Sequence, residues 1–425
     1  MLVGLAIRET LSEAAESLQE LESLAESAGA IVADRILQRR DRPDPRFYIG
    51  KGKVEELAQR VVATDADVVI FDDDLSPAQI REIEKICKCK VIDRSELILD
   101  IFASRARTHE ARLQVELAQL EYTAPRLRGM WTHLERIAGA GGGTGAGSVG
   151  GIGTRGPGER QIEIDRRIVS RRMTFLKRQI SEIDKRKVRQ VQARHEHFNV
   201  SLVGYTNAGK STLMNALTGA EVKARDRLFE TLDTKTARWN LGGAHFALLS
   251  DTVGFVRRLP HHLIASFRAT LEEAIHADLL LHVVDASSPT AWEQYEAVTK
   301  VLEELGCAGN NTLVLLNKMD AAQDPAAVTV LRHKLPNALP ISAKTGRGLP
   351  ELVEHVRGLV TGPPHEATLR LPSSDGRALA FIEKNTEVKD RRYTDHMLEL
   401  DVTIGQVMLN RIREAFPTTE IVEIQ

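Results

Sequence analysis

The stretch Gly204-Tyr205-Thr206-Asn207-Ala208-Gly209-Lys210-Ser211-Thr212 decides how this chain folds. It has the spacing G-x-x-x-x-G-K-[ST], follows the apolar run 198–203, and leads into the helix-like run 213–217. A strand, a glycine-bearing loop and a helix in that order make a phosphate cradle, because the loop N–H groups and the positive end of the helix dipole face the same anion. The stretch therefore predicts a nucleotide site inside an α/β domain.

Within this loop, each expected role follows from the residue type. Lys210 is expected to reach the outer phosphates, and the Ser211 hydroxyl is expected to ligate Mg²⁺. The alternative is a glycine-rich turn that carries Lys-Ser by chance, and the strand and helix on either side argue against it. The loop residues predicted to contact the nucleotide are Gly204, Asn207, Ala208, Gly209, Lys210, Ser211 and Thr212.

Two later segments supply candidates for the metal and the γ-phosphate. Thr231 can complete the Mg²⁺ coordination and sense the γ-phosphate, although Thr234 and Thr236 are alternatives at nearly the same distance along the chain. Asp251 follows an apolar strand-like run and suits a role in holding Mg²⁺, while the N–H of Gly254 can contact the γ-phosphate. We expect Ser211, Thr231 and Asp251 at the metal, and Lys210, Thr231, Gly254 and Asn207 in catalysis.

Selectivity for the base is predicted from the next two strand ends. Asn317-Lys318-Met319-Asp320 follows an apolar run, and the Asp320 carboxylate can accept both the ring N–H and the amino N–H of guanine. Adenine lacks this pair of donors. Ser342-Ala343-Lys344 follows another strand and can brace the base. Motifs in this order, each after a strand, predict a domain that binds GTP and hydrolyses it to GDP and phosphate.

Phe255 stands where many GTPases carry a glutamine that positions the attacking water. A phenylalanine cannot orient water, so we expect slow intrinsic hydrolysis that depends on help from a partner. Asn207 offers a side-chain oxygen near the phosphates, and we hypothesise that it helps to hold K⁺ in place of an arginine finger. An asparagine that only stabilises the loop is the alternative.

Composition sets outer limits on the class of protein. The 425 residues are 42% hydrophobic and 27% charged, with a net charge of −2, which is ordinary for a globular chain of about three domains. This balance argues against a uniformly basic nucleic-acid binder but allows a local patch. Cys87, Cys89 and Cys307 form neither a disulfide framework nor a zinc pattern. No membrane span or signal peptide is indicated, so we expect a cytoplasmic protein. We also expect it to be a monomer.

Residues 1–107 alternate strand-like and helical segments, which predicts a small α/β domain on a parallel sheet. Arg46 to Lys53 interleaves basic, aromatic and glycine residues, a mixture that suits docking on a phosphate backbone with base stacking. An ordinary helix entry is the alternative. Asp72 to Asp74 ends a strand, where we favour a solvated turn over a site. The expected strands are 2–7, 30–37, 68–71 and 90–93.

Residues 108–195 contain two long helical runs, 110–128 and 160–194, which predict a helical hairpin. From Glu159 to His195 there are twelve Lys or Arg against five Asp or Glu. In a nearly neutral chain this excess favours a polyanion partner over a merely solvated face. Eleven of the twenty residues 139–158 are glycine, so this loop cannot form a packed core. It either inserts into a crowded site on a partner or serves as a tether.

The remaining segments complete the predicted organisation. Residues 196–362 hold the nucleotide motifs, and Gly362-Pro363-Pro364 marks a linker. In 363–425, two strands and two helices predict a small α+β module without a chemical motif. The expected strands there are 368–371 and 397–402, and the expected helices are 375–384 and 405–416. The predicted fold class is α/β, with a P-loop domain preceded by the small α/β domain and its hairpin and followed by the α+β module.

The chain resembles the HflX family of translational GTPases along its whole length. The resemblance rests on RFYIGKGKVEEL (46–57), GGIGTRGPGE (150–159), QIEIDRRI (161–168), GYTNAGKST (204–212) and DTVGFVRRLPHHLIASFRATLEE (251–273). It implies an N-terminal α/β domain, a helical subdomain, a Ras-like G domain and a short C-terminal domain. It also implies that Thr231 is the switch threonine and that a hydrophobic residue at the position of Phe255 is normal.

The same resemblance implies binding to the large ribosomal subunit, with the glycine-rich loop near the ribosome's catalytic centre and a role in splitting ribosomes under stress. We therefore expect a ribosome-associated GTPase whose hairpin engages large-subunit rRNA and whose hydrolysis of GTP resets binding. One alternative is a factor that wedges the ribosome while the nucleotide only tunes affinity. Another is a GTPase of RNA modification or signalling that acts away from ribosomes.

Overall fold

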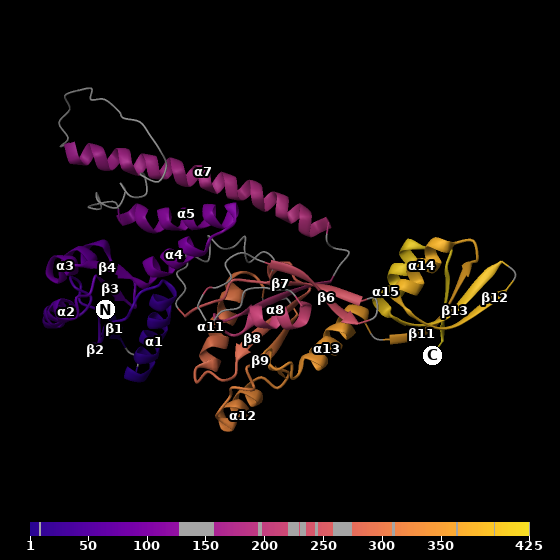
Figure 1. Cartoon of the computed structure of the whole chain (residues 1–425). Helices are drawn as coiled ribbons and strands as arrows, with labels where there is room; N and C mark the ends of the chain where they lie inside the picture. Colours follow the sequence, from indigo (N-terminus) through magenta and orange to yellow (C-terminus); the bar gives the residue numbers. More distant parts are fainter. Residues whose placement is uncertain are drawn as a thin grey trace. The chain divides into compact units, whose positions relative to one another are not determined.

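The computed structural model describes residues 1–7, 10–126, 157–193, 198–219, 229, 235–242, 245–257, 274–307, 311–362, 364–394 and 396–424 (Figure 1). They form two compact units. The first comprises Met1–Gln190, Arg225–Asp233 and Val253–Leu271, and the second comprises Val191–Ala224, Thr234–Thr252 and Glu272–Gln425. Thr231 and most of the predicted glycine-rich loop lie outside the described residues. No helix in the described part of the chain is long and apolar enough to cross a bilayer.

A four-stranded parallel sheet forms the base of the first unit, in the order β2-β1-β3-β4. Helix α1 contacts α4 and helix α2 contacts α3, so the connections between strands cover the sheet as the alternating pattern predicts. The second strand begins at Arg35, not at residue 30 as expected. The elements are β1 (Leu2–Ala6), α1 (Leu11–Ser27), β2 (Arg35–Arg39), α2 (Lys51–Thr64), β3 (Val68–Phe71), α3 (Pro77–Cys87), β4 (Lys90–Asp93) and α4 (Arg94–Arg105).

The segment Arg46–Lys53 does not present aromatic rings for base stacking, so that prediction is wrong. Phe47, Tyr48 and Ile49 are 6%, 9% and 0% exposed and belong to the apolar core of the first unit. The Tyr48 ring packs edge-on against Phe71 with 6.3 Å between ring centroids. These apolar side chains close the core where the chain enters α2, as an ordinary helix entry does.

Asp72 is also not part of a solvated turn. It is buried at the end of β3, where one carboxylate oxygen accepts from Arg94 Nη1 at 2.7 Å and the other accepts from Ser17 Oγ at 2.5 Å. A buried carboxylate needs such partners to offset the loss of hydration. The sequence showed three adjacent acidic residues but could not show that α1 and α4 bring their partners to one of them.

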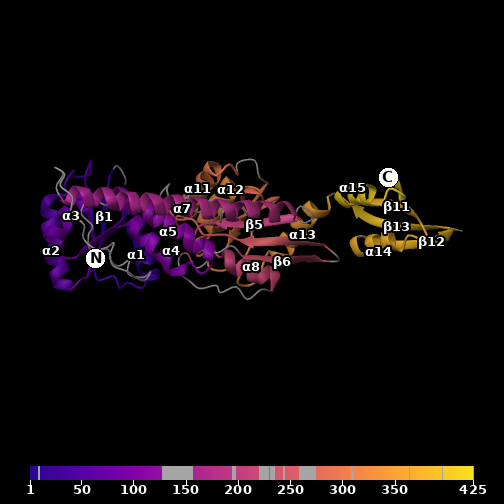
Figure 2. The ribbon, with the colours of Figure 1, turned by 90° about the horizontal axis from the view of Figure 1, so that it is seen from above.

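Helices α5 (His109–Thr123) and α7 (Pro157–Ala193) pack side by side, and a 3-10 turn, η1 (Ala124–Arg126), follows α5 (Figures 1 and 2). The first helix is shorter than the expected run to residue 128. Three apolar side chains of the second helix lie outside the packed face and are exposed. The packed residues are Leu113, Leu117, Leu120, Val169 and Leu176, and the exposed ones are Ile164 (36%), Ile168 (59%) and Phe175 (50%).

A six-stranded sheet, in the order β10-β9-β8-β5-β7-β6, carries the nucleotide motifs in the second unit. Only β6 pairs antiparallel, so the other strands bring their carboxyl ends to one edge, where open α/β sheets bind ligands. The strands are β5 (Phe198–Gly204), β6 (Lys235–Gly242), β7 (His245–Asp251), β8 (Leu279–Asp285), β9 (Thr312–Asn317) and β10 (Leu339–Pro340). The helices are α8 (Lys210–Thr218), α11 (Ala291–Glu304), α12 (Pro325–Lys334) and α13 (Leu349–Thr361).

The C-terminal part of the second unit is an antiparallel sheet in the order β12-β13-β11-β14, with α14 and α15 packed on it (Figure 1). The succession βαββαβ with this order is the ferredoxin-like arrangement. The sequence analysis missed β12 and β14. Both are edge strands, and β12 reads Glu-Val-Lys-Asp-Arg-Arg-Tyr-Thr, which lacks an alternating apolar pattern. The elements are β11 (Pro364–Pro372), α14 (Gly376–Asn385), β12 (Glu387–Thr394), β13 (Met397–Gly405), α15 (Gln406–Ala415) and β14 (Glu420–Ile424).

Candidate nucleotide-binding site

The phosphate loop joins β5 to α8, and two of its glycines are required by close contacts. A Cβ atom on Gly204, whose φ is +150°, would lie 2.3 Å from the carbonyl oxygen of Val283. A Cβ atom on Gly209, whose φ is +96°, would lie 2.4 Å from Nδ2 of Asn317. Asn207 adopts a φ of +60°, which asparagine tolerates better than most residues. The loop therefore bends tightly and sits against two neighbouring strands.

Lys210 begins α8 and turns back over the loop. Its ammonium group donates to the carbonyl oxygens of Gly204 at 3.1 Å and Tyr205 at 2.8 Å, and the residue is 7% exposed. Burial lowers the pKa of Lys210 to about 8, and the negative charge of Asp251 partly opposes this effect. An incoming phosphate would favour the charged ammonium and offset its desolvation. The side chain is thus positioned for an anion beside the loop.

Ser211 and Asp251 come together from α8 and β7. The Ser211 hydroxyl donates to Oδ2 of Asp251 at 2.6 Å, and Asp251 is fully buried. Among the described residues there is no cluster of three or more His, Cys, Asp or Glu that could hold a metal. Mg²⁺ at phosphate sites needs only one or two carboxylates because phosphate oxygens and waters complete its octahedron. The hydroxyl and carboxylate oxygens therefore fit a magnesium ion that arrives with a nucleotide.

Asn317 connects the phosphate loop to the loop after β10. Its side-chain Nδ2 donates to the carbonyl oxygen of Ala208 at 2.8 Å, and its Oδ1 accepts from the backbone N–H of Ala343 at 2.9 Å. Asn317 is 1% exposed, so both bonds are shielded from water. The sequence analysis placed this residue in the Asn317–Asp320 motif expected to bind the nucleotide. The structure shows that it ties the two ends of the site together.

Asp320 lies on the exposed side of the same loops. Its Oδ1 accepts from the Ser342 hydroxyl at 2.6 Å, and this bond lowers the pKa of Asp320. The carboxylate is consequently ionised at neutral pH and can accept hydrogen bonds. Lys318, with a φ of +61°, forms an ion pair with Asp285 at 2.7 Å. Lys344 is exposed and its charge also lowers the pKa of Asp320.

Thr231 lies outside the described residues, and Gly254 is buried in the first unit with the segment Val253–Leu271. Thr212 is half-buried on α8, and Asn207 is exposed at the loop.

Two buried residues beside the phosphate loop were missed by the sequence analysis. His282 on β8 pairs with Val203, stacks on Tyr295 with 4.9 Å between ring centroids, and is 2% exposed. Burial, reinforced by the charge of Lys210, lowers the pKa of His282 to about 3, so its ring is neutral. The second is Thr206, whose hydroxyl is buried inside the loop. A polar residue inside the apolar run of β8 was the available signal for the histidine.

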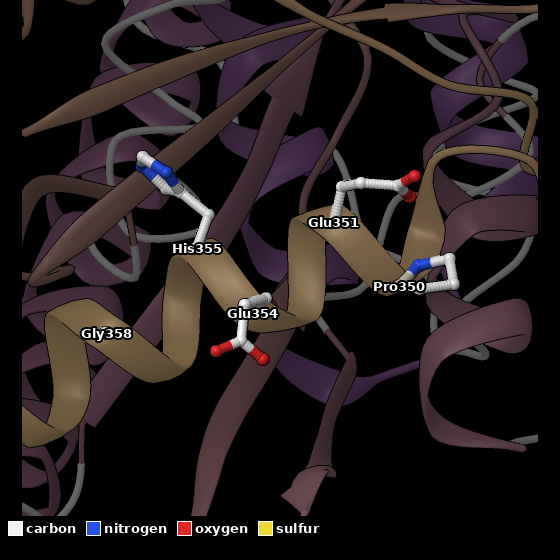
Figure 3. Close-up of a pocket in the computed structure, with 5 residues that line it drawn as sticks. All are labelled: Pro350, Glu351, Glu354, His355 and Gly358. Atoms are coloured by element: carbon white, nitrogen blue, oxygen red, sulfur yellow. The ribbon is translucent and has the colours of Figure 1, made fainter.

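A shallow pocket on α13 does not belong to the nucleotide site. Figure 3 shows Glu351 and His355 pointing to one side of the helix and Glu354 pointing to the other, with Pro350 and Gly358 completing the lining. None of these residues lies in the loops at the carboxyl edge of the sheet. The negative charges of Glu351 and Glu354 would also repel a phosphate.

Comparison with known proteins gives three family matches in sequence order. The family described as "GTP-binding GTPase N-terminal" matches residues 15–103, and "GTP-binding GTPase Middle Region" matches 105–194. The family described as "50S ribosome-binding GTPase" matches 199–318. Together they cover most of residues 15–318, including the phosphate loop, and end two residues before Asp320.

Individual relatives extend over nearly the whole chain. The GTPase HflX of Escherichia coli (strain K12) is 46% identical over 406 residues, which are 95% of this chain and 93% of the relative. The GTPase HflX of Magnetococcus marinus is 43% identical over 402 residues, 93% and 90% of the two chains. Among solved structures, a GTP-binding protein from Sulfolobus solfataricus in complex with GDP is 25% identical, covering 84% of this chain and 98% of that one, with a TM-score of 0.44. This chain belongs to the HflX family of GTPases, and it hydrolyses GTP to GDP and phosphate.

Proposed function

We propose that this GTPase binds the large ribosomal subunit and uses GTP to split or rescue ribosomes under stress. Two kinds of observation support the proposal. The family described as "50S ribosome-binding GTPase" matches the domain that carries the phosphate loop. Within the described residues, the first unit also carries exposed arginines that form no ion pair. A factor of this kind would act as a monomer in the cytoplasm.

The observation that carries the RNA part of the proposal is the charge on α7. Arg172 pairs with Glu116 at 2.7 Å and Lys177 pairs with Glu121 at 2.8 Å, so these two cations are neutralised by α5. On the same helix, three exposed arginines form no ion pair within the described part of the chain: Arg166, Arg167 and Arg171. Unpaired arginines on a regular helix attract a phosphate backbone.

The domain roles follow from this assignment. We propose that the α/β domain (1–107) supports the helical hairpin (108–195), and that the hairpin and its glycine-rich loop (139–158) contact rRNA. The G domain (196–362) would bind the nucleotide, and the ferredoxin-like domain (363–425) would supply a further protein or RNA contact.

In the proposed mechanism, Lys210 binds the outer phosphates and Asp320 accepts the guanine N–H groups. Ser211 and Asp251 would hold Mg²⁺, which would neutralise negative charge on the phosphates during hydrolysis. Thr231 and the N–H of Gly254 would complete the contacts to the metal and the γ-phosphate. The remaining proposed contacts to the nucleotide are Gly204, Asn207, Ala208, Gly209, Thr212, Asn317, Lys318, Ser342, Ala343 and Lys344.

Because of Phe255, we expect the rate of GTP hydrolysis to depend on a partner. It is 2% exposed and cannot orient an attacking water, whereas many GTPases use a glutamine there. The ribosome would therefore supply or order the missing group, which makes free-protein hydrolysis slow.

Hydrolysis is expected to depend on K⁺ if Asn207 holds a monovalent cation near the phosphates. Ribosome-stimulated hydrolysis should then be faster in K⁺ than in Na⁺ at equal ionic strength, and Asn207→Ala should remove the difference. Steady-state phosphate release in the two buffers measures this. Equal rates in K⁺ and Na⁺ for the unaltered protein would discard the cation role and leave Asn207 as a loop residue.

Reversing three charges on α7 is expected to weaken binding to large subunits. Arg166→Glu/Arg167→Glu/Arg171→Glu should lower affinity by at least about tenfold and reduce the slope of log affinity against log salt by about 2 to 3, since each phosphate contact contributes up to about one counterion. Co-sedimentation with isolated large subunits at several salt concentrations measures both. Arg332→Glu, an exposed arginine on α12, is the matched control.

The outcomes separate the competing functions. Unchanged binding by the triple variant would show that α7 is not the RNA contact. If the unaltered protein failed to sediment with large subunits at low salt, the ribosomal function itself would be wrong. A GTPase of RNA modification or signalling would then be the better assignment.

A further inference from the structure

Thr206 is the third residue of the phosphate loop, and its hydroxyl has no assigned use. The residue is 6% exposed, and its Oγ1 atom is buried without a hydrogen-bond partner in the described part of the chain. A buried hydroxyl without a partner lowers the stability of the fold, so native structures keep few of them. The atom sits in a loop whose ligand is an anion rich in acceptor oxygens. The ligand is therefore the natural partner of this donor.

The position of Thr206 within the loop indicates which phosphate it meets. Lys210 donates to the carbonyl oxygens of Gly204 and Tyr205, so the first half of the loop lies beside its ammonium group. In phosphate loops this lysine reaches the outer phosphates, while the start of the following helix takes the inner ones. Thr206 directly follows Tyr205. Its side chain is consequently at the outer end of the phosphate site.

We propose that the Thr206 hydroxyl donates a hydrogen bond to a γ-phosphoryl oxygen of GTP. GDP has no oxygen at this place, so the contact distinguishes the triphosphate from the diphosphate. The inference rests on GTP being held on the phosphate loop, as proposed above, and does not depend on the ribosomal function.

Two buried hydroxyls outside the phosphate loop serve for comparison with Thr206. Thr252 is fully buried, and its hydroxyl donates to the carbonyl oxygen of Leu202 at 2.6 Å, so it is satisfied within the fold. Ser201 on β5 is 1% exposed, and its Oγ has no hydrogen-bond partner in the described residues. Ser201 lies in the strand and not in the loop. It is therefore a matched control for a buried hydroxyl that the nucleotide does not reach.

The test compares the affinities of GDP and of a non-hydrolysable GTP analogue, measured by calorimetry with Mg²⁺. Thr206→Val keeps the shape and removes the hydroxyl, and it should weaken the GTP analogue by roughly tenfold, the size of one hydrogen bond to a charged group. Its affinity for GDP should stay within about twofold. Thr206→Ser restores the donor and should recover most of the loss. Ser201→Ala should change neither affinity.

Equal losses for both nucleotides in Thr206→Val would assign the hydroxyl to packing of the loop and overturn the inference. Unchanged affinity for the analogue would overturn it as well, because water would then satisfy the hydroxyl. Retained GDP binding shows that the variant is folded. Failure of the unaltered protein to bind the analogue would instead contradict the placement of GTP on the loop.

Discussion

Replacing Asp320 by Asn is expected to change the preferred base of this enzyme from guanine to xanthine. The Asp320 carboxylate is ionised, since its bond from Ser342 lowers its pKa, and an ionised carboxylate only accepts hydrogen bonds. Guanine offers two donors to it. An Asn side chain presents one acceptor and one donor, so its amide N–H₂ meets the guanine amino group. Xanthine carries a carbonyl at that position and accepts from the amide instead.

The expected size of this change is large. The bond from the guanine amino group is lost, and the bond from the ring N–H is no longer made to a charged group; since such charged bonds are worth about 1.5–3 kcal/mol each, the affinity for GTP should fall by roughly 10²–10⁴-fold. Affinity for xanthosine triphosphate should rise toward the original GTP value. Competition between the two nucleotides, read by calorimetry or by hydrolysis rate, measures the reversal.

Asp324→Asn is the control for this experiment. It makes the same chemical change four residues further along, where Asp324 caps α12 by accepting from the N–H of Ala326 at 2.8 Å. Asparagine serves equally well at such a cap, so stability and base preference should not change. If Asp320→Asn left the preference for guanine intact, another group would have to read the base.

Replacing Lys210 by Ala is expected to abolish most of the GTPase activity. The ammonium group is the one positive charge that the described phosphate loop contributes, and removing a single group that stabilises transition-state charge costs about 10²–10³-fold in rate. The variant loses the stabilisation from two hydrogen bonds to loop carbonyl oxygens. It also loses the free-energy cost of burying a charge, and this gain offsets the loss. The variant should therefore remain folded and bind GTP weakly. Phosphate release at saturating GTP measures the effect.

The same variant discriminates between two ways of acting on ribosomes. If hydrolysis drives splitting or resets the factor, Lys210→Ala should split few ribosomes over many rounds. Splitting at the normal rate without hydrolysis would favour the wedge, in which the nucleotide only tunes affinity. Lys300→Ala, an exposed lysine on α11, should leave both activities unchanged.

The elements that could be predicted from the sequence are those whose defining residues lie within a few positions of one another. The phosphate loop was predictable because its glycines, Lys210 and Ser211 must stand at fixed spacing between a strand and a helix. The capping box of α1 is encoded in the same local way, since Thr10 and Glu13 bond to each other's backbone N–H groups. Both features are formed by residues close together in the sequence and need no distant partner.

Predictions failed where the answer depends on distant partners. Phe47 and Tyr48 look like a stacking surface until the parallel sheet buries them. The exposed Ile168 and Phe175 could not be told from buried ones, since the side of α7 that faces α5 depends on the register between two helices. Strand β12 was missed because edge strands do not need an apolar pattern.

The two bonds of Asn317 have a consequence for how the site chooses its ligand. One amide group fixes both the loop that carries the phosphates and the loop that supports the base. Thermodynamic reciprocity then requires two effects to be equal. The factor by which bound guanine raises the affinity of the site for the phosphates is the factor by which bound phosphates raise its affinity for guanine. A nucleoside or a free phosphate can engage only half of this linked unit. We therefore expect the enzyme to discriminate whole nucleotides from their fragments more sharply than the sum of separate contacts would allow.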